Sequence, residues 1–128
     1  MFTRIRFIGL AFAVMLLVAI VPISSEALGP AHTESTVQVV LSEYQIDMPE
    51  TIVGGFVTFQ VANDGEESHG LVMTGQGFTR RLVRGRVDPG EQTTTLIRVY
   101  PGEYYVYSPA GNDAERGMMR RLWVVGGK

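Results

Sequence analysis

The chain of 128 residues contains no cysteine. Without a thiol it can form no disulfide, thiolate zinc site or iron–sulfur cluster, and it has no cysteine nucleophile. It also has no cysteine to which a lipid could be attached. Any chemistry of this protein must therefore come from histidine, carboxylate, hydroxyl or thioether groups.

An excess of positive charge is also missing. The formal net charge is −2 at pH 7, and no dense basic face of the kind that binds nucleic acid is expected. Hydrophobic residues make up 45% of the chain and charged residues 19%, which is typical of a globular protein. The length allows one folded domain.

Helical periodicity is absent after the first 27 residues, and β patterns take its place. The segment GFVTFQVAN, 55–63, alternates apolar and polar residues with a period of two. The segments 92–100, 103–108 and 121–125 are rich in β-branched and aromatic residues. Since turn residues separate these short strands, we predict an all-β sandwich or small barrel.

Aromatic residues on two of these segments have predicted orientations. On 103–108, Tyr105 and Tyr107 should face one side of the strand and Tyr104 the other. Trp123 is expected to fill the core between the sheets, because an indole removes much apolar area from water.

The longest hydrophobic run, residues 7–23, follows Arg4 and Arg6 and precedes small residues at Ser25 and Ala27. This pattern predicts a signal peptide, 1–27, and a periplasmic or extracellular protein. The alternative is an uncleaved anchor, because a run of this length is just within the range that spans a bilayer. Contact with a membrane is expected only in that case. Residues 28–36 then form a tether and residues 37–128 the folded domain.

Two segments resemble the cupredoxin family of blue copper proteins. The strand ending VAN at 61–63 is followed closely by His69, and the strand EYYVY leads into SPAGNDAERGM at 108–118. The second segment has the spacing of the Cys-x4-His-x4-Met loop of that family. The resemblance covers Val37 to Val125 and implies a cupredoxin-like Greek-key β-sandwich.

The resemblance also implies which residues stand at the ligand positions. His69 matches the first histidine ligand and Met118 the axial methionine, whereas Ser108 stands at the cysteine and Asp113 at the second histidine. A type 1 copper centre depends on a thiolate in a His₂Cys set with a weak axial ligand. We therefore predict no type 1 copper cofactor and no electron transfer. The expected function is a non-catalytic binding or accessory module.

A different metal site is the main alternative. His69 and Met118, with Met73 or Met119 and one oxygen of Asp113, are ligand types that suit Cu(I) without a thiolate. The competing interpretation is that the methionines fill gaps in the core.

A hydrolase is the minor alternative. Ser108, His69 and Asp113 are the residue types of an acyl-transfer triad, and converging ligand positions would make them neighbours. No G-x-S-x-G pattern surrounds Ser108. A structural role competes here too, because Asn112 or Asp113 can cap a short turn that begins at Ala114.

The densest charged feature after residue 27 is a group of arginines between positions 80 and 86. Guanidinium groups bind carboxylates and phosphates through forked hydrogen bonds. The group predicts an extracytoplasmic protein or an anionic surface as the partner, with a solvated loop as the alternative. Its members are Arg80, Arg81, Arg84 and Arg86.

Overall fold

The structure is a computed structural model that describes residues 34–127. The predicted signal peptide or anchor, 1–27, and most of the predicted tether, 28–36, lie outside these residues. Between residues 34 and 127, no helix has the length and apolar character of a membrane span. This part of the chain is made of strands and turns, as the sequence predicts.

Nine strands are present in the described range, and the first begins two residues before the predicted start of the domain. The segments predicted as strands at 55–63, 92–100, 103–108 and 121–125 correspond to β4, β7, β8 and β9. The bounds are β1 Ser35–Ser42, β2 Gln45–Asp47, β3 Thr51–Val53, β4 Gly55–Asn63, β5 Val72–Gly75, β6 Phe78–Arg81, β7 Gln92–Val99, β8 Gly102–Tyr107 and β9 Met119–Val125.

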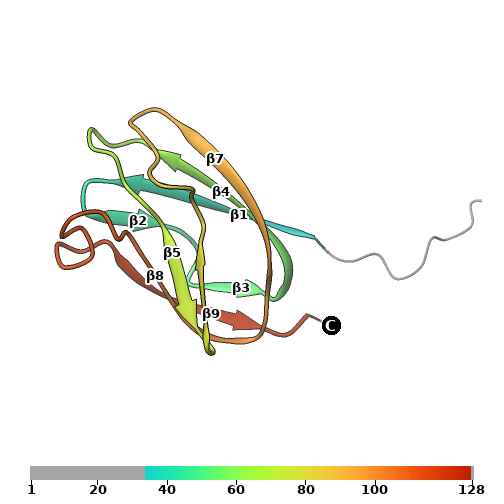
Figure 1. The fold of residues 1–128 in the computed structure, drawn as a ribbon. Helices are drawn as coiled ribbons and strands as arrows, with labels where there is room; N and C mark the ends of the chain where they lie inside the picture. Colours follow the sequence, from blue (N-terminus) through green and yellow to red (C-terminus); the bar gives the residue numbers. More distant parts are fainter. Residues whose placement is uncertain (1–33, 128) are drawn as a thin grey trace, which may run out of the picture.

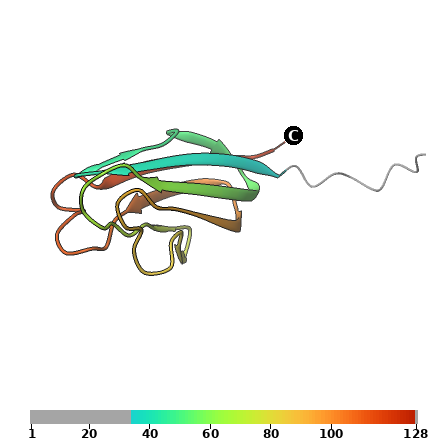
Figure 2. The same cartoon turned by 90° about the horizontal axis from the view of Figure 1, so that it is seen from above.

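The strands form two sheets that pack as a sandwich (Figures 1 and 2). One sheet has the order β2-β1-β4-β7 and the other β3-β9-β8-β5-β6. Both sheets are mixed, because β1 pairs in parallel with β4 and β3 pairs in parallel with β9. The predicted all-β sandwich is confirmed.

The core lies between the sheets and follows the period of two. On β4, Val57, Phe59 and Val61 are fully buried, and on β8 the inward side chains are Tyr104 and Val106. Burying such side chains stabilises the fold by about 1.5–3 kcal/mol each relative to leaving them exposed. The alternating strand therefore contributes one face of the core, as its sequence pattern predicts.

The predicted orientation of the tyrosines is confirmed, but the prediction for Trp123 is wrong. Tyr104 is buried, whereas Tyr105 on the opposite face is 40% exposed. Trp123 is 45% exposed because Leu122 and Val124 are the inward residues of β9. Its indole lies on the outer face of the sheet, 5.8 Å from the guanidinium carbon of Arg121.

Candidate functional site

Three connections meet at one end of the sandwich, on the left in Figure 1. They are the turn between β1 and β2, the segment 64–71 after β4, and the loop 108–118 between β8 and β9. The parallel pairing of β1 with β4 sets Leu41 opposite Asn63, so both strands end at the same edge. Residues that follow these strands are thereby brought together.

Asn63 holds the segment that carries His69. Its side chain is fully buried and donates hydrogen bonds to the carbonyl oxygens of Glu67 and Val87, at 2.7 and 2.8 Å. Its side-chain oxygen accepts a hydrogen bond from the backbone N–H of Gly65. His69 is fixed further by two backbone hydrogen bonds with Val87. The histidine is thus placed by paired backbone and a buried amide.

The imidazole of His69 is fully buried between two carboxylates. Nδ1 lies 2.8 Å from Oδ2 of Asp113, and Nε2 lies 3.3 Å from Oε1 of Glu43. The two carboxylates come from different segments of the chain, the turn after β1 and the loop 108–118. Both nitrogens of the buried ring are therefore occupied by side chains of the protein.

Ser108 and Asp113 complete this arrangement from the loop 108–118. The Ser108 hydroxyl donates to Oδ2 of Asp113 at 2.8 Å and accepts from the backbone N–H groups of Gly70 and Ala110, at 3.1 and 3.4 Å. Ser108 is 1% exposed and Asp113 is 7% exposed. We call Glu43, His69, Ser108 and Asp113 the His69 network.

Glu43 is the outer member of the network and is one-third exposed. Its Oε1 accepts hydrogen bonds from the backbone N–H groups of Glu66 and Glu67, at 2.7 and 2.9 Å. These bonds, that from Glu67 above all, and the contact with His69 lower the pKa of the Glu43 carboxyl below its usual 4.5 against the opposing effect of desolvation. Glu43 is therefore ionised at neutral pH.

The residues at this site do not fit a type 1 copper ion. A serine hydroxyl stands where a thiolate is required, and both nitrogens of His69 already face carboxylates. Asp113 and Glu43 lie against different ring nitrogens, so they do not converge on one point. No cluster of three histidine or acidic residues within 34–127 is arranged to hold a metal. In the same range, every buried side-chain nitrogen and oxygen has a hydrogen-bond partner.

The methionines proposed for a Cu(I) site are not all in one place. Met73 and Met118 are fully buried and belong to the hydrophobic core. Met119 begins β9 and is 50% exposed. Of the nitrogen and sulfur ligands proposed from the sequence for Cu(I), His69, Met73 and Met118 are buried and Met119 is not.

The three residue types of a triad are neighbours, but in a different order. In an acyl-transfer triad the histidine bridges the hydroxyl and the carboxylate. Here Asp113 bridges Ser108 and His69, and the serine hydroxyl hydrogen bonds to the carboxylate. This order gives the serine no neighbouring imidazole base.

The sequence left a capping role open for Asn112 or Asp113, and the Asp113 side chain has other partners. Its carboxylate hydrogen bonds to His69 and Ser108, and its backbone carbonyl accepts from the N–H groups of Arg116 and Met118. The turn at 111–117 is therefore formed by backbone hydrogen bonds, and the acidic side chain is free to enter the network.

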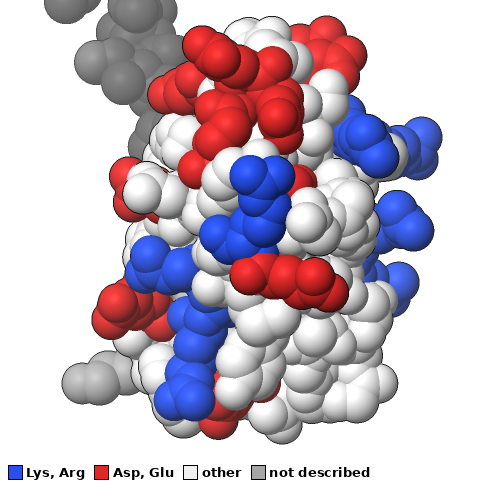
Figure 3. Space-filling view, turned by 90° about the vertical axis from the view of Figure 1, so that its left-hand side faces the viewer, with Lys and Arg blue, Asp and Glu red and all other residues white. Residues whose placement is uncertain are grey.

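The four arginines predicted to bind a partner are all exposed. Arg80 lines a pocket with residues of β7, whereas Arg81 and Arg86 line a smaller hollow near Pro109. Figure 3 views the loop end and shows a gathering of acidic side chains at the top, with basic side chains in separate groups below and to the right. The loop end is of mixed charge.

Sequence reasoning missed Glu43 and the organising role of Asn63. Nothing in the residue types around Glu43 distinguishes it from other surface acids. Its position follows from the parallel register of β1 and β4, which a single sequence does not reveal. For Asn63 the sequence held a signal, because Gly65 follows it by two residues. An asparagine side chain commonly hydrogen bonds to the backbone two residues later in a turn, as it does here.

Comparisons with known proteins agree with the architecture. The sequence matches no protein-family model and no curated protein. Among solved structures, an auracyanin from the photosynthetic bacterium Roseiflexus castenholzii is 17% identical, with a TM-score of 0.56 over 75% of this chain and 99% of that one.

Two further structures show the same similarity. Auracyanin B is 14% identical, with a TM-score of 0.61 over 79% of this chain and 95% of its own. Reduced rusticyanin is 18% identical, with a TM-score of 0.54 over 70% and 79%. At these identities the comparison establishes the fold alone: residues 34–127 have the fold of the cupredoxins.

Proposed function

We propose that this chain is an exported, non-catalytic binding or accessory module in which the His69 network occupies the place of a type 1 copper centre. The observation that carries the proposal is that both ring nitrogens of His69 face carboxylates while Ser108 replaces a thiolate. Electron transfer in the cupredoxin family depends on a copper ion held by a cysteine and two histidines. We propose that this chain does not transfer electrons, because the residues around His69 do not provide that ligand set.

The network supports a structural role for the residues at the former ligand positions. A metal ion would hold the loops 64–71 and 108–118 together by coordination. In this chain, the hydrogen bonds from Gly70 to Ser108, from Ser108 to Asp113 and between Asp113 and His69 connect the same loops. Buried ionisable groups such as His69 and Asp113 are tolerated only when they are paired and hydrogen-bonded.

The proposal is tested by metal analysis and titration of the purified full chain. We expect no copper after purification and no stoichiometric binding of Cu(I) or Cu(II). The matched variants are His69→Ala and His32→Ala, which remove the two histidines of the chain separately. Tight 1:1 binding lost in His69→Ala and retained in His32→Ala would contradict the proposal.

A Cu(I) site at His69 and Met118 is the second candidate, and the burial of Met118 beside the loop favours it. Cu(I) binding at Nδ1 or Nε2 would have to break a hydrogen bond to Asp113 or Glu43. The Cu(I) arm of the titration, repeated with Met118→Leu, separates the two functions. Binding weakened by both His69→Ala and Met118→Leu would support the metal site.

Export is the remaining part of the proposal. It rests on the basic start, the hydrophobic run 7–23 and the small residues before position 28. Fractionation of producing cells followed by N-terminal sequencing tests it. A mature chain that begins at Leu28 outside the cytoplasm is expected, whereas an intact Met1 on membranes would support the anchor.

A further inference from the structure

One pocket in the described part of the chain lies away from the His69 network. It has a volume of about 750 Å³ and lies between β6 and β7, which are the edge strands of the two different sheets. Small organic ligands usually occupy sites of about 300–1,000 Å³. The space between these two edge strands is therefore large enough for a small molecule.

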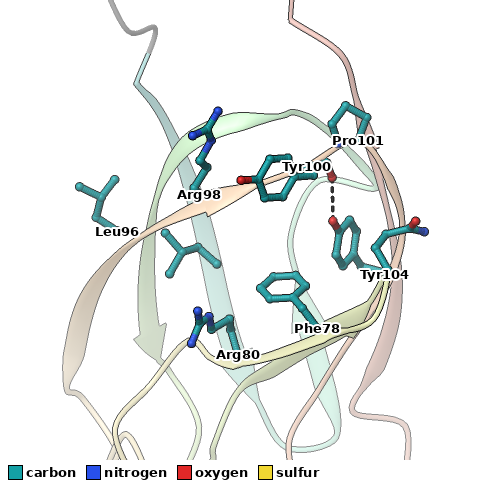
Figure 4. A pocket seen from close by; sticks show the side chains of 9 residues that line it. Phe78, Arg80, Leu96, Arg98, Tyr100, Pro101 and Tyr104 are labelled. Carbon is teal, nitrogen blue, oxygen red and sulfur yellow. Dashed lines mark hydrogen bonds between the residues drawn. The ribbon is translucent and has the colours of Figure 1, made fainter.

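Aromatic and aliphatic side chains form the walls of this pocket (Figure 4). Phe78 and Tyr104 meet edge to face, with ring centroids 5.6 Å apart, and Leu96 and Ile97 contribute from β7. The Tyr104 hydroxyl donates to the carbonyl oxygen of Tyr100 at 2.7 Å. Tyr104 is fully buried, so its ring supports Phe78 from the core side of the pocket.

The two sheets are joined by a hydrogen bond near the pocket, and two large side chains that line the pocket are exposed. The Thr95 hydroxyl donates to the carbonyl oxygen of Leu82 at 2.8 Å and ties the two sheets together beyond the pocket. Leu96 and Tyr100 are 56% and 58% exposed, although such side chains are more often covered. A ligand that lies against them would remove this apolar surface from water.

Two arginines provide charge at the pocket. Arg80 lies over the Phe78 ring at 6.0 Å, and Arg98 lies over the Tyr100 ring at 5.2 Å. Within residues 34–127, the ion pairs of arginine are those of Arg120 with Glu50 and Arg121 with Glu103. Arg80 and Arg98 have no carboxylate partner there, and no acidic residue lines the pocket.

We propose that this pocket binds an aromatic carboxylate, with its ring against Phe78 and Tyr100 and its carboxylate on Arg80 and Arg98. Edge and face contacts between aromatic rings favour a planar ligand. A guanidinium binds a carboxylate through two parallel hydrogen bonds. The inference rests on the proposed function as a binding module and gives that module a ligand class.

The test is calorimetric titration of the full chain with 2-naphthoate. We expect saturable 1:1 binding that weakens at least tenfold in the double variant Arg80→Gln with Arg98→Gln. Arg84→Gln is the matched control, because Arg84 is an exposed arginine that does not line the pocket. The neutral 2-naphthamide should bind at least tenfold more weakly than 2-naphthoate, and its affinity should change little in the double variant.

Several results would overturn this inference. They are the absence of saturable binding below about 1 mM, equal affinity in the double variant and in Arg84→Gln, or tighter binding of dodecanoate than of 2-naphthoate. Thermal unfolding of each variant shows whether it is folded. The copper titration does not involve this pocket. If 2-naphthoate fails to bind and the chain also binds no copper, the ligand inference is wrong but the metal part of the proposed function stands.

Discussion

His69 is held between the carboxylates of Glu43 and Asp113. A metal-bound histidine uses one ring nitrogen for the metal and commonly donates the other to a carboxylate or carbonyl oxygen. In this chain Glu43 provides such an acceptor at Nε2, and Asp113 occupies Nδ1. Asp113 is thus the residue that closes the site, because its oxygen also accepts from Ser108.

Removal of the Asp113 carboxylate should destabilise the fold. Asp113→Ala leaves the Nδ1 hydrogen of His69 and the hydroxyl of Ser108 buried without an acceptor. We expect a loss of about 2–4 kcal/mol in the free energy of unfolding, measured by urea denaturation. Glu115→Ala, an exposed acid in the same loop, is the control and should change stability by less than about 0.5 kcal/mol. Equal losses in the two variants would contradict the role of Asp113.

Glu43 gives the network a dependence on pH. Because its pKa is lowered in the folded state, its stabilising effect is complete above the unfolded value and is lost as the pH falls through the lowered folded value. Glu43→Gln should therefore differ most in stability from the parent chain at about pH 6 and least at about pH 3. The measurement is urea unfolding at both pH values. A difference that is the same at both would argue against the ionised carboxylate.

At the scale of elements, the loop 108–118 is held against the turn between β1 and β2. Gly117 has a φ of +123°, and a Cβ atom there would lie 2.8 Å from the carbonyl oxygen of Tyr44. The guanidinium carbon of Arg116 lies 3.6 Å from the centre of the Tyr44 ring. The loop is thus in close contact with the turn that carries Glu43.

Gly117→Ala should disturb this contact. The added Cβ meets backbone, and the positive φ is unfavourable for alanine, so we expect a loss of about 1–3 kcal/mol in unfolding free energy. Gly111→Ala is the control from the same loop, because Gly111 has a positive φ of +49° but nothing within 4 Å of a Cβ. Thermal unfolding should show a larger loss for Gly117→Ala. The reverse order would mean that the close approach to Tyr44 is unimportant.

The sequence predicted four of the nine strands of the described range, β4, β7, β8 and β9, but not which side chains of β9 face the core. Alternation on β4 was unambiguous, since polar residues separate the apolar ones. On β9 the run RLWVV is apolar on both faces, and indole size suggested that Trp123 is buried. Arg121 lies two residues before Trp123 and therefore on the same face of the strand. A charged residue on that face agrees with the outward orientation of Trp123 in the structure. Glu43 was not predictable, because it reaches His69 through a parallel strand pairing.

At the scale of the whole molecule, the sandwich separates two regions with different chemistry. The His69 network closes the loop end, and the pocket opens between the sheet edges at β6 and β7. In the proposed function, the loop end has a structural role and ligand binding is assigned to the pocket. Fold and function are separable in this way because function resides in particular side chains on a shared architecture.

The proposed replacement of a metal by hydrogen bonds predicts that a copper ligand set can be introduced at this site. In the double variant Ser108→Cys with Asp113→His, the loss of the Asp113 carboxylate frees Nδ1 of His69, while Glu43 still faces Nε2. The new thiolate and imidazole would then join His69 and Met118 at the four ligand positions that the cupredoxin resemblance implies. Such a set suits Cu(II).

The most direct test is a Cu(II) titration of the parent chain and this double variant side by side, followed by visible absorption and metal analysis. The parent chain should bind no stoichiometric copper, and the folded double variant should bind one ion and absorb strongly in the visible range. Stoichiometric copper in the parent chain that depends on His69, or a folded double variant that binds none, would contradict the replacement of a copper centre by the His69 network.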